Sequence, residues 1–163
     1  MAKKILQTKG FGNVPIRLAK QISERANFAF HDGTMHRSVT PLTAELLNFW
    51  FDESYCEIRS VNFHEGQRQA IINIIYLHEV LKIDNVMDIY ERVAPELLTE
   101  FNFTGLSQSK YQFAKYAVKM ATGTGKTWVW HAILIWQILN ALNEDNETQT
   151  GRFTKNFFDF FYH

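Results

Sequence analysis

Residues 120–127 read Met120-Ala121-Thr122-Gly123-Thr124-Gly125-Lys126-Thr127. Two glycines let a short backbone segment curl, so that successive N–H groups point at one triphosphate. A lysine directly after the second glycine would reach the β- and γ-phosphates, and the hydroxyl that follows would lie on Mg²⁺. We therefore predict that this phosphate loop binds a nucleotide through Thr122, Gly123, Thr124, Gly125, Lys126 and Thr127, with Thr127 holding the Mg²⁺.

The segments on either side of the loop predict an α/β fold. Residues 113–120 are rich in strand formers, and residues 128–142 are an apolar run of helical length without Gly or Pro. A strand, a phosphate loop and a helix in this order are typical of the start of a P-loop NTPase lobe. Because the helix is apolar nearly all round, we expect it to be buried beneath a parallel sheet. The alternative is a chance glycine-rich turn before a helix.

The composition predicts one globular domain. The chain has 163 residues, 46% of them hydrophobic, and its 17 basic and 17 acidic side chains balance. No overall basic field therefore indicates nucleic acid. Residues 1–30 hold six basic side chains against Glu24 alone. This local excess indicates either contact with a phosphate backbone or, equally, a solvated face.

Cysteine and histidine usage indicates a reducing compartment. Cys56 is the only cysteine, so no internal disulfide can form, and the six histidines show no metal-ligand spacing. The N-terminus lacks the apolar core and cleavage site of a signal peptide. Residues 128–142 are too short to span a bilayer and include polar side chains. We therefore expect a cytoplasmic protein with no membrane partner.

Helices are predicted ahead of the loop. Thr40 followed by Pro41 is typical of a helix N-terminus, and this helix is expected to end near Asp52. A second helix is predicted from about residue 65, because apolar side chains recur there at three- and four-residue steps. A third is predicted over residues 86–99, with Pro95 interrupting or kinking it.

Gln67 is the second candidate binding residue. It lies at the start of the second predicted helix, within Phe63-His64-Glu65-Gly66-Gln67-Arg68-Gln69-Ala70-Ile71. A glutamine amide offers a donor and an acceptor together, so it can pair with N6 and N7 of adenine. The alternative is an ordinary solvated side chain, and only the phosphate loop downstream favours the adenine role.

These elements divide the chain into three parts. Residues 101–109 are interpreted as a loop before the predicted strand. The parts are a partly irregular N-terminal extension (1–39), a helical region with the adenine-side glutamine (40–110) and the start of the P-loop NTPase lobe (111–163).

With both motifs in place, the chain resembles the N-terminal region of DEAD/DEAH-box superfamily 2 helicase-like proteins of the type III restriction enzyme Res (R) subunit class. Met120 stands where a strict phosphate loop has glycine, and a residue other than glycine there fits this family better than small-molecule kinases or GTPases. The segments that carry the resemblance are 37–43 (RSVTPLT), 46–51 (LLNFWF), 67–71 (QRQAI), 74–77 (IIYL) and 118–129 (VKMATGTGKTWV).

The resemblance implies an ATP-driven motor on double-stranded DNA. The fold would be an incomplete RecA-like P-loop NTPase lobe with a mostly helical N-terminal extension. ATP and Mg²⁺ would be the cofactors, and a DNA-modification subunit a further partner. By this resemblance Gln67 would recognise adenine, the phosphates would lie on Gly123, Gly125 and Lys126, and Thr127 would bind magnesium.

The acidic partner of such a motor is missing after Lys126. A motor needs an Asp-Glu pair that helps to hold Mg²⁺ and activates water, whereas residues 144–147 are interpreted as a solvated turn. An aromatic run at 153–162 stands where the second strand belongs, so we expect a truncated motor. The alternative is a genuine strand that ends a compact domain. This chain alone is expected to bind ATP–Mg²⁺ weakly at most and not to turn it over.

Two other classes of function stay open. A small P-loop phosphotransferase is disfavoured by Met120 and by the long segment before the loop. A non-catalytic interaction module would bury aromatic-rich helices against a partner, and 15% of the residues are Phe, Trp or Tyr.

Overall fold

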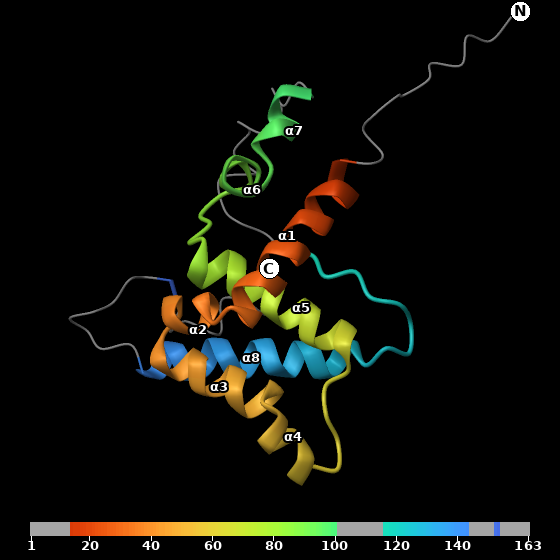
Figure 1. Ribbon diagram of the computed structural model, residues 1–163, viewed down its shortest axis with the longest axis vertical. Coiled ribbons are helices and arrows are strands. Elements are labelled where there is room, and N and C mark those ends of the chain that lie inside the picture. The colour runs from red at the N-terminus through yellow and green to blue at the C-terminus, as the bar shows by residue number, and fades with distance from the viewer. Residues whose placement is uncertain (1–13, 101–115, 144–151, 154–163) are drawn as a thin grey trace, which may run out of the picture. The chain divides into compact units, whose positions relative to one another are not determined.

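The computed structural model describes residues 14–100, 116–143 and 152–153. Every regular element in this part of the chain is a helix (Figure 1). The chain forms two compact units, one of Met1–Arg25 with Ile83–Lys115 and one of Ala26–Lys82 with Tyr116–His163. Each unit is described by itself below.

The α/β fold class, an incomplete RecA-like P-loop lobe, is contradicted by this all-helical architecture. Residues 116–120 of the expected strand form no regular element, and residues 113–115 lie outside the described part. A strand needs a neighbouring strand to pair its backbone N–H and C=O groups, and no described segment provides one. Val118, one of the strand-favouring residues, is 42% exposed, while Met120 at the end of the segment is partly buried against the core.

The first unit contains the early part of α1 (Val14–His31), together with α6 (Val86–Val93) and α7 (Pro95–Glu100). The predicted break at Pro95 is confirmed, because a proline ring cannot continue α6 and instead begins α7. The guanidinium of Arg25 donates to the backbone carbonyl of Arg92 at 2.8 Å. This bond satisfies a carbonyl near the C-terminal end of α6.

The second unit contains the two helices predicted on either side of residue 60. α3 (Pro41–Phe51) begins after Thr40, whose side chain accepts a hydrogen bond from the backbone N–H of Thr43. α5 (Glu65–Ile75) begins at the predicted residue. Both predictions are confirmed. The remaining elements of this unit, most of them not predicted, are the end of α1, α2 (Thr34–Ser38), α4 (Glu53–Ile58), the π-helix η2 (Tyr76–Val80) and α8 (Lys126–Asn143).

α8 is the predicted helix after the loop, but it is not buried all round. Its covered face, which includes Val129, Ala132 and Trp136, packs on α3 and α5. Trp128 is 54% exposed and Leu142 is 76% exposed. The expectation of a helix beneath a parallel sheet is therefore wrong for the described residues, because helices cover one side and no sheet covers the other. None of the described helices is both long and apolar enough to cross a membrane.

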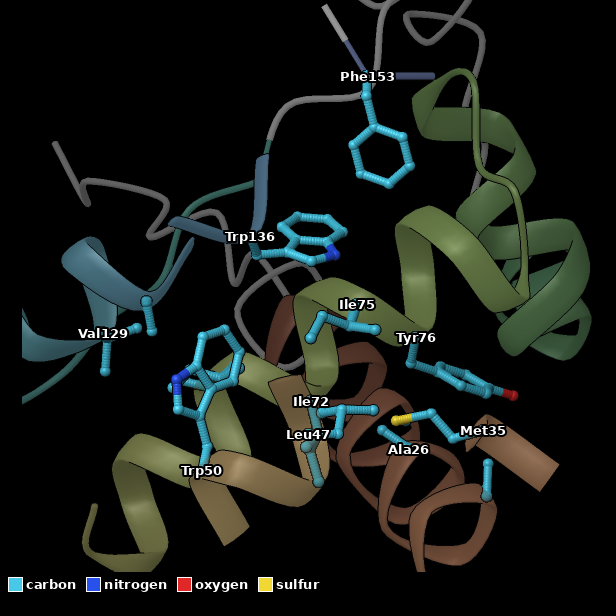
Figure 2. Close-up of a cluster of buried hydrophobic side chains, with 14 of the residues drawn as sticks. Ala26, Met35, Leu47, Trp50, Ile72, Ile75, Tyr76, Val129, Trp136 and Phe153 are labelled. Atoms are coloured by element: carbon cyan, nitrogen blue, oxygen red, sulfur yellow. The ribbon is translucent and has the colours of Figure 1, made fainter. Parts of the chain in front are cut away.

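Trp136 is part of the hydrophobic core of the second unit, close to Phe153 (Figure 2). Its indole is fully buried, with the rings of His78 and Phe153 edge-on at centroid distances of 5.2 and 5.5 Å. His78 is joined to Arg152 twice: its Nε2 lies 3.0 Å from the Arg152 carbonyl, and Arg152 Nε donates to the His78 carbonyl. The short described segment 152–153 is thus fixed onto η2 and α8.

A buried carboxylate connects α3, η2 and α8. Glu79, on η2, accepts hydrogen bonds from the Thr40 backbone N–H (2.8 Å), the Thr43 hydroxyl (2.6 Å) and the Trp136 indole N–H (2.7 Å). Asn140 extends this group, since its amide nitrogen donates to the Thr43 hydroxyl oxygen at 3.0 Å. The polar groups of this cluster are therefore hydrogen-bonded to one another, which is the condition under which a core tolerates polar groups.

Parts of the sequence interpretation lie outside the described residues. These are the loop at 101–109, the acidic turn at 144–147, the aromatic residues 154–162 and the basic residues Lys3, Lys4 and Lys9.

We predict that Glu79→Ala lowers the free energy of unfolding by about 3 kcal/mol, because it removes the acceptor of the buried Thr43 hydroxyl and the shorter of the two hydrogen bonds of the Trp136 N–H, which keeps only the Thr43 oxygen at 3.0 Å. Urea unfolding followed by Trp fluorescence measures the change. Glu45→Ala, on the exposed side of α3, is the matched control and should cost less than about 0.5 kcal/mol. Equal effects of the two substitutions would contradict a structural role for the buried carboxylate.

Candidate nucleotide-binding site

The phosphate loop forms a tight turn that leads into α8. Gly123 and Gly125 both have positive φ angles, of 81° and 66°, in the left-handed region that residues with a Cβ rarely adopt. The Thr124 hydroxyl donates to the Ala121 carbonyl at 2.7 Å, and the Trp128 N–H donates to the Gly125 carbonyl at 3.0 Å. The two glycines are thus required by the backbone path itself.

The polar side chains predicted to contact a nucleotide are placed around this turn. α8 begins at Lys126, so Lys126 and Thr127 are its first two residues, and both are exposed. Thr122 is exposed in the turn, and Thr124 is half-buried. The N-terminal end of a helix carries unsatisfied N–H groups and a partial positive charge. Lys126 adds a full charge at the same end, so this end of α8 suits an anion.

Gln67 lies directly against the loop. Its side-chain Nε2 is 3.2 Å from the Thr124 carbonyl and 3.2 Å from the Gly125 carbonyl, to both of which it donates. Its Oε1 accepts from the His64 backbone N–H at 3.0 Å. The glutamine and the phosphate loop, predicted separately from the sequence, are therefore adjacent in the structure. This is a consequence of α5 packing beside α8 with their N-terminal ends together (Figure 1).

The hydrogen bonds of Gln67 bear on its predicted contact with adenine. The amide has two N–H donors, and both carbonyls of the loop use them. Gln67 is buried, with 6% of its surface exposed, so the alternative of an ordinary solvated side chain is wrong, and N6 of adenine reaches Oε1 only if the side chain moves. Pairing with N7 as well requires one of the two N–H groups to leave the loop. Recognition of adenine by Gln67 stays a prediction.

His64 is a contact of the loop that the sequence interpretation did not identify. It is the N-cap residue of α5, and its Nδ1 accepts from the backbone N–H groups of Gly66 (3.1 Å) and Gln67 (3.4 Å). Its Nε2 lies 3.0 Å from the Thr124 carbonyl. A capping residue followed three positions later by Gln is the signal of a capping box, and it could have indicated a role for His64.

Aromatic side chains also contact the start of α8. The ring of Phe63, the residue before the α5 cap, lies edge-on to Trp128 at 6.2 Å between centroids. Phe63 also packs edge-on against Trp50 and Phe51 of α3, at 6.2 and 5.7 Å. Edge-to-face pairs at these distances are attractive. The beginning of α8 is therefore held by α3 through Phe63 as well as by α5.

Glu79 is the one buried carboxylate among the described residues, and it is not part of this site. It bonds to Trp136, which follows Thr127 by nine residues on α8, a rise of about 13 Å. Glu79 therefore cannot share a magnesium ion with the Thr127 hydroxyl. Within the described segments, no group of three or more His, Cys, Asp or Glu side chains is arranged to hold a metal.

Comparisons with known proteins leave the interpretation of the site to its geometry and motifs. No protein-family model, curated protein or solved structure matches the chain.

We predict that Gly125→Ala displaces the Gln67 side chain from the loop. A Cβ at position 125 would overlap Gln67 Nε2, in addition to the strain of a positive φ. The matched control is Gly123→Ala, which has the same kind of φ but no atom within 4 Å of the added Cβ. The side-chain amide resonances of Gln67 in a ¹⁵N NMR spectrum should shift in Gly125→Ala and stay in place in Gly123→Ala. Identical spectra for the two variants would show that Gln67 does not contact the loop.

Proposed function

We propose that residues 122–127 and Gln67 bind ATP with Mg²⁺. The observation that carries this proposal is the adjacency of the glutamine to the loop, through the 3.2 Å contacts of Gln67 Nε2 with the Thr124 and Gly125 carbonyls. A chance glycine-rich turn has no reason to lie against the upstream glutamine that was predicted to read adenine. In this site Lys126 and the N-terminal end of α8 take the phosphates, and Thr127 takes the metal.

The wider activity proposed is that of a DNA motor of the superfamily 2 kind, as in the type III restriction Res subunit. The chain is its ATP-binding N-terminal part, and hydrolysis on duplex DNA belongs to the full-length parent. This proposal is based on the sequence motifs and on the site, and it does not include a parallel sheet. The chain by itself binds ATP–Mg²⁺ weakly at most and without turnover, because no carboxylate for activating water is placed beside Thr127 among the described residues.

Double-stranded DNA is the partner proposed with this activity, and a DNA-modification subunit is a second. Arg17 and Lys20 are exposed on α1, and Lys20 lies 3.7 Å from Glu24 on the same helix. A contact with DNA phosphates through these side chains would weaken as salt rises. Titration of a short duplex at low and high salt tests it.

A non-catalytic interaction module is the second candidate function. It is favoured by the apolar stripe of exposed side chains along α8, which consists of Trp128, Ile135, Leu139 and Leu142. These residues recur at seven, four and three positions, so they lie on one side of the helix. Stable co-purification with a partner that protects this stripe, together with no affinity for nucleotide, would favour this function over the first.

We predict that Lys126→Ala weakens ATP–Mg²⁺ binding at least about tenfold, since the ammonium group contacts the phosphates directly. Isothermal titration calorimetry measures the affinity. Lys82→Ala, an exposed lysine just beyond η2 and at the far end from the start of α5, should bind as the unsubstituted chain does. Equal affinity of the Lys126 and Lys82 variants, or no binding by the unsubstituted chain, would overturn the proposed site.

A further inference from the structure

We propose that His64 is a positioning residue that holds the phosphate loop open for an anion. This inference rests on the proposed nucleotide site. It assigns to His64 a role separate from the recognition of adenine and from the contacts of Lys126 with phosphate.

The two contacts of the His64 ring determine which nitrogen carries the proton. Nδ1 faces the backbone N–H groups of Gly66 and Gln67, at 3.1 and 3.4 Å, so it must be an acceptor. In a neutral imidazole the other nitrogen then carries the hydrogen. Nε2 is therefore the donor to the Thr124 carbonyl, at 3.0 Å. The His64 imidazole therefore caps α5 with one nitrogen and holds the loop with the other.

The bond to Thr124 sets the direction of the next N–H group. In a trans peptide the C=O of one residue and the N–H of the next point in opposite directions. No cis peptide occurs in the described residues. His64 draws the Thr124 carbonyl toward the start of α5, so the N–H of Gly125 points away from α5.

Gln67 does the same for the following peptide. Its Nε2 donates to the Gly125 carbonyl at 3.2 Å, so the N–H of Lys126 is also directed away from α5. Consecutive N–H groups aimed to one side are what binds a phosphate at the start of a helix. His64 and Gln67 therefore orient the donors of the loop before any ligand arrives.

Holding these donors in place removes part of the ordering cost of binding. Loss of one neutral hydrogen bond to the loop should weaken ATP–Mg²⁺ binding about fivefold. The loop should also become more mobile without ligand, since a turn with two left-handed glycines has few other constraints.

His64→Asn separates the two functions of the ring. Asparagine is among the best N-cap residues, so the start of α5 stays capped. Its side chain ends before the position of Nε2 and cannot reach the Thr124 carbonyl. His64→Ala, which loses both contacts, is the comparison that reports the cost of the cap.

The experiment compares the unsubstituted chain with His64→Asn, His64→Ala and Lys82→Ala. We expect ¹⁵N NMR of the His64 ring to show a protonated Nε2 and an unprotonated Nδ1. In His64→Asn the backbone ¹⁵N order parameters of Gly125 and Lys126 should fall from about 0.85 toward about 0.6, and ATP–Mg²⁺ should bind about fivefold more weakly. The thermal midpoint should fall in His64→Ala and stay within about 2 °C in His64→Asn.

Two results would overturn the inference, and they are distinguishable. Unchanged order parameters of Gly125 and Lys126 and unchanged affinity in His64→Asn would refute the positioning role and leave the proposed function intact. No ATP–Mg²⁺ binding by either the unsubstituted chain or Lys82→Ala would refute the proposed function, and the positioning role with it.

Discussion

The hydrogen bond from the Trp136 indole N–H to Glu79 fixes the position of α8 along η2 in the second unit. It joins α8 to η2 at 2.7 Å, and Glu79 in turn accepts from Thr40 and Thr43 at the start of α3. A buried carboxylate with several donors has few alternative arrangements, because moving any of them leaves a polar group without a partner. Apolar packing alone would permit α8 to slide more freely along α5.

This fixed register extends to the other end of the same helices. Gln67 and Gly125 are in contact at the N-terminal ends of α5 and α8, and Glu79 and Trp136 are in contact about three turns further along both. The helices therefore run parallel, and both present their N-terminal ends to one place. The partial positive charges of the two N-terminal ends therefore lie close together. The Thr124 and Gly125 carbonyls at this place are hydrogen-bonded to His64 and Gln67. The site depends on a contact in the core that is itself remote from any ligand.

The sequence predicted local structure well where a single residue dictates the backbone. Thr40-Pro41 predicted the start of α3, Pro95 predicted the break after α6, and the loop before α8 was predicted from its two glycines. Each depends on a cap, a ring or a positive φ, all of which are local. The sheet was predicted wrongly, because a strand exists only if a second strand pairs with it, and strand-favouring composition does not report a neighbour.

The candidate site was predicted only in part, for a related reason. Gln67 and the loop were chosen by residue type, and their adjacency follows from the packing of α5 on α8, which no motif encodes. His64 was missed because histidine is not among the usual N-cap residues, although Gln67 three positions later completes the pattern of a capping box. Its second contact, to the Thr124 carbonyl, spans 60 positions of sequence.

The π-helix η2 is a segment in which the deletion of a single residue would disturb the core. The Leu81 N–H bonds to the Tyr76 carbonyl, five residues back, so this turn holds one residue more than an α-helical turn. Deleting one residue would restore a regular helix and rotate His78 and Glu79 away from Trp136. Such a deletion is tolerated in most surface loops, but here it would break the hydrogen bond between Glu79 and Trp136, as the loss of the Glu79 side chain does. The extra residue is thus a spacer that brings His78 and Glu79 to Trp136.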